Sequence, residues 1–323
     1  MIEKLIEKIK GKGTRIVFTE GSDARILEAA VRLHKENILV PVLLGNRAEI
    51  VGAANALGFD VDGIEMLDPE EYKHMDLMIR KVVELRKGKM DEEMAHKACL
   101  KTNFFGTMYV KLGCADGLLG GATYSTADTV RPALQLVKTR PGNSIVSSCF
   151  ILLKGDEQLV MGDCSINIDP SADDLVEITL QTAHTVRQFG IEPNVGLLSY
   201  STLGSAKGPS VDKVKEAATR LKRMPLDFGV EGELQFDCAV ASEVAELKAP
   251  GSTVAGHVNT FIFPDINSGN IGYKIAARLG GYEAIGPILQ GLNAPINDLS
   301  RGCNAEEVYK MAIVTAAQKY MDI

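Results

Sequence analysis

The segment 284–320, "AIGPILQGLNAPINDLSRGCNAEEVYKMAIVTAAQKY", joins an apolar, glycine-containing run to a helical pattern through a polar connection. The first part is typical of a buried strand, and "VYKMAIVTAAQKY" (308–320) has its apolar residues at helical spacing. Between them, "NDLSRGCNAEE" (297–307) places an Asp, a Ser, an Arg, a Cys and two Glu side by side. α/β proteins tend to hold their ligands at such strand-to-helix connections, so we expect a functional site here.

The same alternation of strand-like and helix-like segments runs along the whole chain. Examples of strand-then-helix pairs are "TRIVFTE" with "SDARILEAAVRLHKEN" (14–37), "ILVPVLLG" with "NRAEIVGAANALG" (38–58), and "ADGLLGG" with "STADTVRPALQLVKTR" (115–140). The stretch 91–113 reads as one long helix. This alternation predicts an α/β fold with parallel sheets covered by helices on both faces.

Two features bear on the domain organisation. A chain of 323 residues is longer than one hydrophobic core usually serves, so we expect two lobes, with a first crossing at "KTRPGNS" (138–144). The stretch "NSIVSSCFILLKGDEQLVMGDCSINIDP" (143–170) predicts a β-hairpin. We expect this hairpin at a sheet edge, and the alternative is an arm that pairs with a second copy of the chain.

Composition argues against several classes of protein. The net charge is −7 and the basic residues are dispersed, which gives little support to binding of nucleic acid or a membrane surface. No apolar run is long enough to span a membrane, and the start has charges throughout, unlike a signal peptide. The six cysteines lie far apart without a CxxC pair, which predicts reduced thiols rather than disulfides or a zinc site. We therefore expect a cytoplasmic protein.

Familiar cofactor and nucleophile motifs do not occur. There is no GxGxxG after the first strand, no GxxxxGK[ST] and no GxSxG. The five histidines show no metal-ligand spacing. Metal-dependent and triad-type mechanisms are therefore not favoured.

Three loops of small and polar residues remain as candidate sites. "GGATYSTADTVRP" (120–132) opens a helix that Ser125 or Thr126 can cap, with Arg131 further along and an anion-attracting helix start. "SYSTLGSAKGPS" (199–210) can wrap a phosphate with its amides or simply turn a corner. In 297–307, Ser300 is a donor near the helix start and Arg301 is a bidentate clamp for phosphate or carboxyl oxygens.

Other residues of 297–307 have two readings. Glu306 and Glu307 either cap the following helix or perform chemistry, and Cys303 is either a nucleophile or a packing residue. Taken together, the three loops indicate a phosphate-bearing small molecule that is handled without a metal.

Several stretches together resemble the phosphate acetyltransferase (phosphotransacetylase) family in its short form, and the resemblance covers essentially the whole chain. They are "ADGLLGGATYSTADTVRPALQLVKTRPG" (115–142), "DPSADDLVEITLQTA" (169–183), "SYSTLGSAKGPSVDKV" (199–214), "EGELQFD" (231–237) and "FIFPDINSGNIGYKIAARLGGYEAIGPILQGLNAPINDLSRGCNAEEVY" (261–309).

The resemblance implies reversible transfer of an acetyl group between acetyl phosphate and coenzyme A, giving acetyl-CoA and orthophosphate, with no metal or other cofactor. It also implies two doubly wound α/β domains with a cleft between them, as in isocitrate and isopropylmalate dehydrogenases, and a homodimer. Because the last segment of the family returns to the first domain, we expect domains at 1–140 plus 296–323 and at 141–295, the second carrying the hairpin and forming the dimer.

The resemblance also implies residue roles. Ser300 and Arg301 match the pair that contacts acetyl phosphate, and Arg86 and Arg131 match arginines tied to coenzyme A and the phosphate. Weaker candidates for lining the phosphate pocket are Ser125, Thr126 and Tyr273. Cys303 matches a family cysteine near the site that is not a nucleophile.

The implied mechanism is direct attack of the coenzyme A thiolate on the acetyl carbonyl within a ternary complex, after a carboxylate has taken the thiol proton. Two positions depart from the family pattern. Glu307 stands where the family base is normally Asp, and a shift of about 1 Å in a catalytic group can cost about a hundredfold in rate. Tyr124 stands where a His is usual, which we interpret as tolerated variation.

There are three alternatives to phosphate acetyl transfer. Phosphate butyryltransferase shares the fold and chemistry, but "NDLSRGC" and "GYKIAARLGG" fit the acetyl enzyme better. An oxidoreductase of the isocitrate dehydrogenase type would need metal-binding aspartates and a nicotinamide loop. A non-catalytic regulatory module is disfavoured because Ser300, Arg301, Arg131 and Arg86 are all in place.

Overall fold

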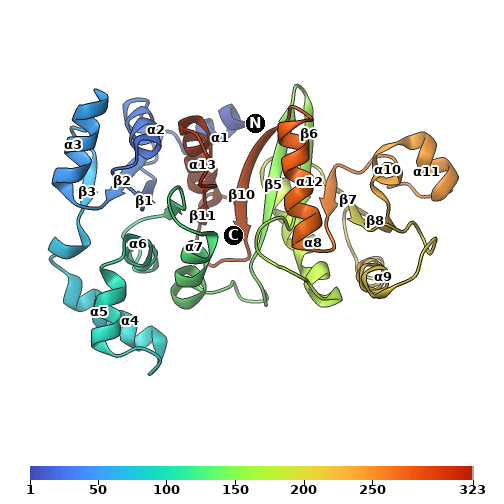
Figure 1. Cartoon of the computed structure of the whole chain (residues 1–323), viewed down its shortest axis with the longest axis horizontal. Coiled ribbons are helices and arrows are strands. Elements are labelled where there is room, and N and C mark those ends of the chain that lie inside the picture. The colour runs from blue at the N-terminus through green and yellow to red at the C-terminus, as the bar shows by residue number, and fades with distance from the viewer. Residues whose placement is uncertain (322–323) are drawn as a thin grey trace. The chain divides into compact units, whose positions relative to one another are not determined.

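The computed structural model describes residues 1–321 (Figure 1). The chain forms two compact units. The first combines Met1–Pro141 with Leu292–Ile323, and the second is Gly142–Gly291. The segment after the second unit thus returns to the first unit and contributes its last strand and helix.

The first unit is built on a five-stranded sheet in which every neighbouring pair is parallel. The strand order is β11 (Ile296–Asp298), β4 (Gly117–Gly120), β1 (Arg15–Phe18), β2 (Val40–Leu44) and β3 (Glu65–Leu67). The central strands β1 and β4 are buried along most of their length, as expected for short apolar strands covered on both faces. The predicted parallel α/β architecture is confirmed for this unit.

Helices cover both faces of this sheet. Their bounds are α1 (Ile2–Ile9), α2 (Ala24–Lys35), α3 (Arg47–Leu57), α4 (Met75–Arg86), α5 (Glu92–Cys99), α6 (Thr102–Lys111), α7 (Thr126–Pro132) and α13 (Ala305–Gln318). α13 packs against α1, α2 and strands β1 and β4, whereas α6 packs on β1 and β4 next to α5 and α7 (Figure 1). Almost every residue of α13 from Val308 to Gln318 is buried, which explains its mainly apolar composition.

Two helices differ from the sequence prediction. The stretch 91–113 is not one helix, because Lys101 adopts an extended conformation and separates α5 from α6. On α6, after this break, Phe105 is completely buried and its ring packs on those of Tyr72 and Tyr109. After Pro132, the chain continues without interruption as a π-helical turn over Ala133–Val137.

The second unit contains a six-stranded mixed sheet. Its order is β10 (Glu283–Gln290), β5 (Ser147–Lys154), β6 (Glu157–Gly162), β9 (Thr260–Ile262), β7 (Asn194–Leu198) and β8 (Gly229–Leu234). The predicted hairpin is present as the antiparallel pair β5–β6, but its expected place at the sheet edge was wrong. β10 pairs with β5 on one side and β9 pairs with β6 on the other, so the apolar hairpin is buried inside the sheet.

Both faces of the second sheet are also covered. The helices are α8 (Ala172–Gln188), α9 (Pro209–Leu221), α10 (Phe236–Val240), α11 (Ser242–Lys248) and α12 (Ile266–Arg278). One buried cluster gathers around α8 and α9 and includes Leu175 and Val214; another includes Phe150 and Phe261. Over residues 1–321, no helix has both the length and the apolar character needed to cross a membrane.

Candidate active site

The ends of three neighbouring parallel strands meet at one edge of the first sheet. β1, β4 and β11 are adjacent, and Asp298 at the end of β11 lies opposite Gly120 at the end of β4. Beyond these ends come Glu20, the loop before α7 and the loop Leu299–Asn304 before α13. The carboxyl ends of parallel strands are the usual location of ligands in α/β folds, and here polar side chains from separate parts of the sequence gather.

The guanidinium of Arg25 joins three of these connections. Its Nε and Nη2 donate to the carboxylate of Asp23, at 3.0 and 2.8 Å. Nη2 also donates to the carbonyl of Ala122 at 2.9 Å. Nη1 donates to the carbonyls of Arg301 and Cys303 at 2.9 and 3.1 Å. One cation therefore holds the loop after β4 and the loop after β11 against the start of α2.

Asp298 makes a second link between the same loops. Its side chain is 1% exposed, and its two oxygens accept hydrogen bonds from the hydroxyls of Thr126 at 2.6 Å and Thr129 at 2.5 Å. Burial raises the pKa of Asp298 to about 6, and the nearby Glu20 contributes in the same direction, while the hydroxyl hydrogen bonds oppose the rise.

Glu20 is the other carboxylate of the cluster. It accepts from the Thr123 amide at 2.9 Å and from the hydroxyls of Thr123 and Thr19, at 3.2 and 2.9 Å. Burial raises the pKa of this carboxyl. Tyr124, which departs from the family pattern, has its hydroxyl 2.7 Å from that of Thr19, and burial raises its pKa as well. The phenol therefore belongs to the same hydrogen-bond network.

The start of α7 differs from the predicted cap. Ser125 occupies the N-cap position, but its hydroxyl donates to the carboxylate of Asp128 at 2.6 Å and accepts no helix amide. The hydroxyl of Thr126, predicted to line a phosphate pocket, donates a hydrogen bond to Asp298. The hydrogen bond from Ser125 lowers the pKa of Asp128, and the charge of Arg131, which is exposed in the last turn of α7, adds to this effect.

Ser300 and Arg301 lie on the exposed part of the loop before α13. Ser300 is not a cap of that helix: its Oγ accepts from the Gly302 amide at 3.3 Å, and the N-cap is Asn304. Both side chains stand in solvent, while Arg25 holds the backbone beneath them. The arrangement presents a hydroxyl and a guanidinium on a fastened loop.

The two acidic residues after this loop have different partners. Glu307 closes a capping box with Asn304: the Glu307 amide donates to the Asn304 side chain at 2.9 Å, and the Asn304 amide donates to Glu307 Oε2 at 3.2 Å. Glu is a preferred residue at this position of a capping box, which gives a structural reason for Glu here. Glu306 forms ion pairs with Arg32 at 2.6 Å and Lys310 at 3.5 Å.

Cys303 is 6% exposed, with its Sγ 3.7 Å from Nη1 of Arg25. Burial raises the pKa of this thiol to about 11, although the charge of Arg25 opposes the rise. The thiolate is the reactive form of cysteine, so the protonated thiol is poorly suited to act as a nucleophile at neutral pH.

The remaining predicted residues lie elsewhere. Arg86 is the last residue of α4, and its Nε is buried without a hydrogen-bond partner among residues 1–321. Tyr273 belongs to the second unit, where its ring in α12 stacks on Phe150 at a centroid distance of 3.9 Å. The structure thus gathers Ser125, Thr126, Ser300, Arg301 and Cys303 around the strand ends of the first unit, with Arg131 on α7.

The loop 199–208 in the second unit is closed on itself. The amides of residues 201–206 all donate to acceptors within that unit, namely the hydroxyls of Ser199, Ser201 and Ser205, the carbonyl of Thr202, and the carbonyl and carboxylate of Glu233. The sequence left open whether the amides of this loop bind a phosphate or the loop simply connects a strand to a helix. Because the amides already donate to acceptors within the unit, the structure favours a simple connection.

Comparison with known proteins gives the family. The model of the phosphate acetyl/butaryl transferase family matches residues 1–316. The chain belongs to this family. It is 52% identical to the phosphate acetyltransferase of Bacillus subtilis, over 97% of each chain. A solved phosphotransacetylase from Streptococcus pyogenes is also 52% identical, with a TM-score of 0.94 over 98% of this chain and 97% of that one.

A more distant structural likeness concerns the fold alone. A putative 4-hydroxythreonine-4-phosphate dehydrogenase from Salmonella typhimurium is 12% identical, with a TM-score of 0.50 over 95% of this chain and 98% of that one. This agrees with the expected dehydrogenase-like architecture. As a member of the phosphate acetyl/butyryl transferase family, the chain is a transferase, and identity of about half over its length supports phosphate acetyltransferase as its activity.

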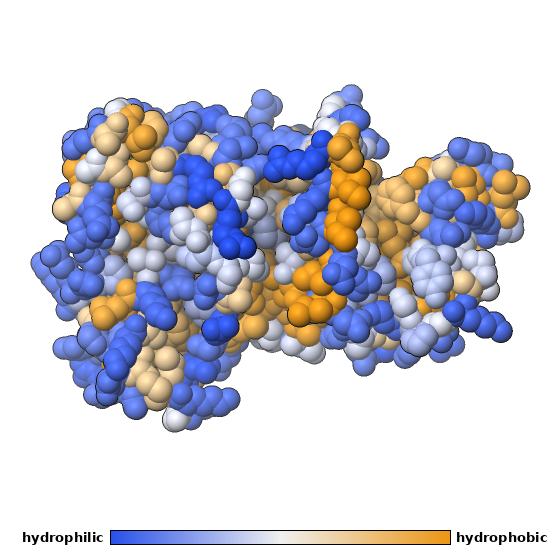
Figure 2. Space-filling model, in the orientation of Figure 1, coloured by the Kyte–Doolittle hydropathy of each residue, from blue (hydrophilic) through white to orange (hydrophobic). Residues whose placement is uncertain are grey.

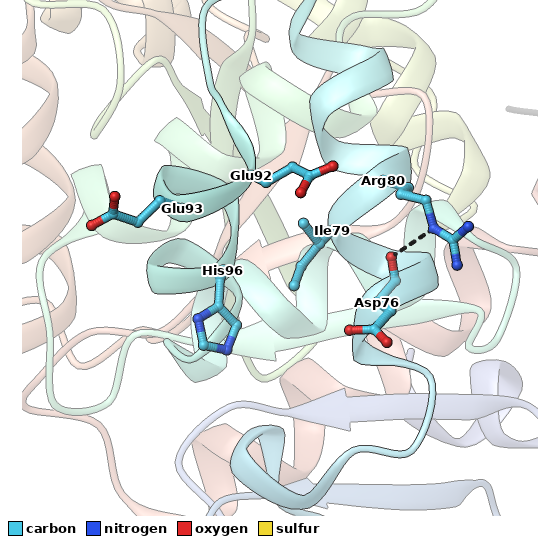
Figure 3. Close-up of a pocket in the computed structure, with 6 residues that line it drawn as sticks. All are labelled: Asp76, Ile79, Arg80, Glu92, Glu93 and His96. Carbon is cyan, nitrogen blue, oxygen red and sulfur yellow. Dashed lines mark hydrogen bonds between the residues drawn. The ribbon is translucent and has the colours of Figure 1, made fainter.

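This transferase also has a hollow of about 520 Å³ between α4 and α5 (Figure 3). It is lined by Asp76, Ile79, Arg80, Glu92, Glu93 and His96. Three carboxylates against one arginine make its walls net acidic, and such walls repel phosphate groups. We therefore do not assign the substrates of the transferase to this hollow.

Sequence reasoning missed three residues of the candidate site: Arg25, Asp298 and Glu20. Glu20 ends a predicted strand, Arg25 lies in the first turn of the helix that follows it, and Asp298 is part of the quoted segment "NDLSRGC". Their position after a strand was the available signal. Their partners in the other connections, however, are between 97 and 278 positions away in sequence, which no local pattern reveals.

Proposed function

We propose that this chain transfers an acetyl group reversibly between acetyl phosphate and coenzyme A by direct attack in a ternary complex. The observation that carries the proposal is the exposed Ser300–Arg301 pair, held by Arg25 beside α7 in a chain that matches the family over residues 1–316. The acetyl phosphate relatives are the ones at high identity, which favours an acetyl over a butyryl substrate.

The cations serve the anionic parts of the substrates. Arg301 and Ser300 hold acetyl phosphate and stabilise the negative charge that develops on the carbonyl and phosphate oxygens. Arg131 and Arg86 bind phosphate groups of coenzyme A or of acetyl phosphate. The buried, unpartnered Nε of Arg86 is a donor that a bound substrate oxygen would satisfy, and leaving such a group unpaired costs about 1–3 kcal/mol. Ser125 and Tyr273 are further candidates for contact with the substrates.

The chemical step needs one proton acceptor. The thiol of coenzyme A, with an ordinary thiol pKa of about 8.5, gives its proton to Glu307. The sulfur then forms a bond to the acetyl carbon, and the bond from that carbon to the phosphate oxygen breaks, releasing orthophosphate. Glu307 uses Oε2 in the capping box, so Oε1 is the oxygen we assign to the proton.

The reaction needs no covalent acetyl-enzyme in this proposal. Cys303, the one cysteine in the loop, is buried and protonated at neutral pH. We also propose that neither a metal nor another cofactor takes part, since the arginines supply the positive charge that acyl transfer from a phosphate requires.

The decisive experiment measures thioester formation from coenzyme A with acetyl phosphate and, separately, with butyryl phosphate, each with and without a chelator. We expect a strong preference for acetyl phosphate that the chelator does not change. A preference for butyryl phosphate would replace the substrate but keep the mechanism. No thioester from either substrate would overturn the proposed activity.

We further propose a homodimer formed through the second unit. α12 exposes Ile271 and Ile275, and Leu279 follows one turn later, with exposed fractions of 58%, 53% and 84%. They form an apolar column over α12 that is visible in Figure 2. A spacing of four residues places them on one face of the helix, and apolar faces of this kind are typical of protein interfaces.

Light scattering tests the dimer. We expect twice the chain mass for the unaltered protein and a single chain mass for Ile275→Lys. Glu243→Lys on α11, an exposed position in the same unit, is the control and should stay dimeric. A monomeric unaltered protein would contradict the dimer, and a dimeric Ile275→Lys variant would move the interface away from α12.

We also propose a cytoplasmic location. All six cysteines are free, and four of them are completely buried. Free thiols persist in reducing compartments. Fractionation of cells that express the full chain tests this assignment, and enzyme found outside the cytoplasmic fraction would contradict it.

A further inference from the structure

Asp298 lies between the two loops of the candidate site. Ser300 and Arg301 follow it by two and three residues on one side, and α7 with Arg131 lies on the other. Thr126 and Thr129 are three residues apart on α7, so their hydroxyls project from the same face of that helix, and each donates to a different oxygen of Asp298.

The backbone around Asp298 is adapted to this carboxylate. Gly121 has a φ of +101°, and a Cβ on it would stand 2.2 Å from Oδ1 of Asp298. A side chain at Gly121 would therefore displace the carboxylate from the two threonines. The Leu299 amide donates to the carbonyl of Gly120 at 2.7 Å, which ties the start of the loop after β11 to the end of β4.

The double acceptance calls for a carboxylate. An ionised carboxylate accepts through both oxygens, whereas an amide of the same shape accepts through one and donates through the other. Packing alone does not call for a charge here, because a fully buried charge is costly and is usually retained only where it has partners. Two titratable groups act with Asp298 at these strand ends: the carboxyl of Glu20, whose charge helps to raise the pKa of Asp298, and the phenol of Tyr124.

We propose that ionised Asp298 is a positioning residue for acetyl transfer, holding α7 and its Arg131 at a fixed place relative to Ser300 and Arg301. This inference rests on the proposed function. Asp298 itself is buried and does not need to touch the substrate. It acts through the two threonine hydroxyls, so that the groups on α7 and the groups on the loop after β11 meet the same substrate in register.

Titration gives the inference a signature. As the pH falls through about 6, Asp298 takes up a proton and one oxygen ceases to be a free acceptor for a hydroxyl. Activity should fall with it. Stability should change in the opposite sense: the folded-state pKa lies above the ordinary value of about 3.9, so this group's contribution is full below about pH 4 and is lost as the pH rises through 6.

The test compares Asp298→Asn, Thr129→Val and Thr129→Ser with the unaltered full chain. We expect Asp298→Asn to lower kcat by about 10- to 100-fold, as for a misplacement of about an ångström. Thr129→Val should lower kcat to a smaller extent, and Thr129→Ser, which keeps the hydroxyl, should restore most of it. Thr107→Val is the matched control, because the buried Thr107 hydroxyl donates to the Asn103 carbonyl of its own helix; it should leave kcat unchanged.

Two readouts separate positioning from general stability. The acid limb of kcat near pH 6 should be present in the unaltered chain and absent in Asp298→Asn. As the pH rises from about 5 to about 7, the melting temperature of Asp298→Asn should increase relative to that of the unaltered chain, since the variant lacks the ionisation that destabilises the fold.

The outcomes are distinct. Full activity of Asp298→Asn, or an acid limb that it retains, would overturn the role of Asp298 alone. Equal losses of kcat and melting temperature in Thr129→Val and Thr129→Ser would also overturn it, because the hydroxyl would then not be the working group. Failure of the unaltered chain to form a thioester would instead remove the proposed function, and this inference with it.

Discussion

Two loops of similar composition, both following a strand, differ in what they do with their hydrogen bonds. In the loop 199–208 of the second unit, the amides of residues 201–206 are bonded within the unit. In the first unit, Thr123 and Thr126 of the segment 120–126 direct their hydroxyls to carboxylates of other strand ends, at Glu20 and Asp298. The loop 199–208 stabilises itself, while the loop 120–126 joins separate strands into one arrangement.

The comparison shows that richness in Gly, Ser and Thr is not sufficient evidence for an anion site. What matters is whether the amides of the loop already donate to an acceptor within the protein, such as Glu233. The first unit differs further in its loop before α13. This loop carries the exposed guanidinium of Arg301, and Arg25 holds the loop in place through the carbonyl of Arg301. We therefore expect substitutions in the first region to affect turnover and those around Glu233 to affect stability.

The largest effect should follow removal of the exposed guanidinium. Arg301→Ala should lower kcat/KM for acetyl phosphate by about 100- to 1,000-fold, because a donor to the developing charge is lost. Arg301→Lys keeps the charge without the planar fork, so its kcat/KM should lie between those of Arg301→Ala and the unaltered chain. Steady-state kinetics measure both variants. If Arg301→Ala turned over at close to the rate of the unaltered chain, the loop before α13 would have no part in the chemical step.

The next effect concerns the capping box. Glu307→Gln should lower kcat by about 10- to 100-fold, because the amide keeps the cap but cannot accept the thiol proton. Glu306→Gln is the control, since it alters ion pairs of an exposed side chain with Arg32 and Lys310, and such pairs are worth about 0–1 kcal/mol. If Glu306→Gln proved the slower enzyme, the assignment of the base would have to move.

The third prediction tests the second region. Glu233 is 1% exposed and accepts from the Gly204 amide at 2.6 Å and the Ser201 hydroxyl at 3.1 Å. Glu233→Ala should lower the free energy of unfolding by about 1–3 kcal/mol because a buried amide and a hydroxyl lose their acceptor. Glu233→Gln, which keeps an acceptor oxygen, should lose less. Urea unfolding gives the values, and an unchanged midpoint for Glu233→Ala would show that the loop is not held in this way.

The smallest effect is expected at Cys303. Cys303→Ala should keep kcat near that of the unaltered chain and should be equally stable to within a small packing loss, because the buried thiol, with its pKa raised to about 11, takes no part in the reaction. Kinetics at neutral pH check this. Complete loss of activity in a variant that melts normally would restore the covalent route.

Much of the fold followed from local patterns. The helical segments that became α2 and α3 were predicted from their spacing, and in the structure they are closed by local interactions: Asp23 and Asn46 accept helix amides, and Gly58 ends α3 in the left-handed conformation. These are interactions between near neighbours in sequence, so composition and spacing reveal them. The break at Lys101 and the internal place of the β5–β6 hairpin were not predicted, because both depend on packing against distant segments.

The sequence by itself determined the family, the alternation of strands and helices, and the presence of Ser300 and Arg301 on a connection after a strand. Tertiary structure alone decided which groups surround them. It placed β11 beside β4, so that Asp298 reaches α7 and Arg25 reaches the loop before α13. The reason is physical: sheet order and side-chain contacts join residues remote in sequence, and burial then sets the charge states of the groups that meet.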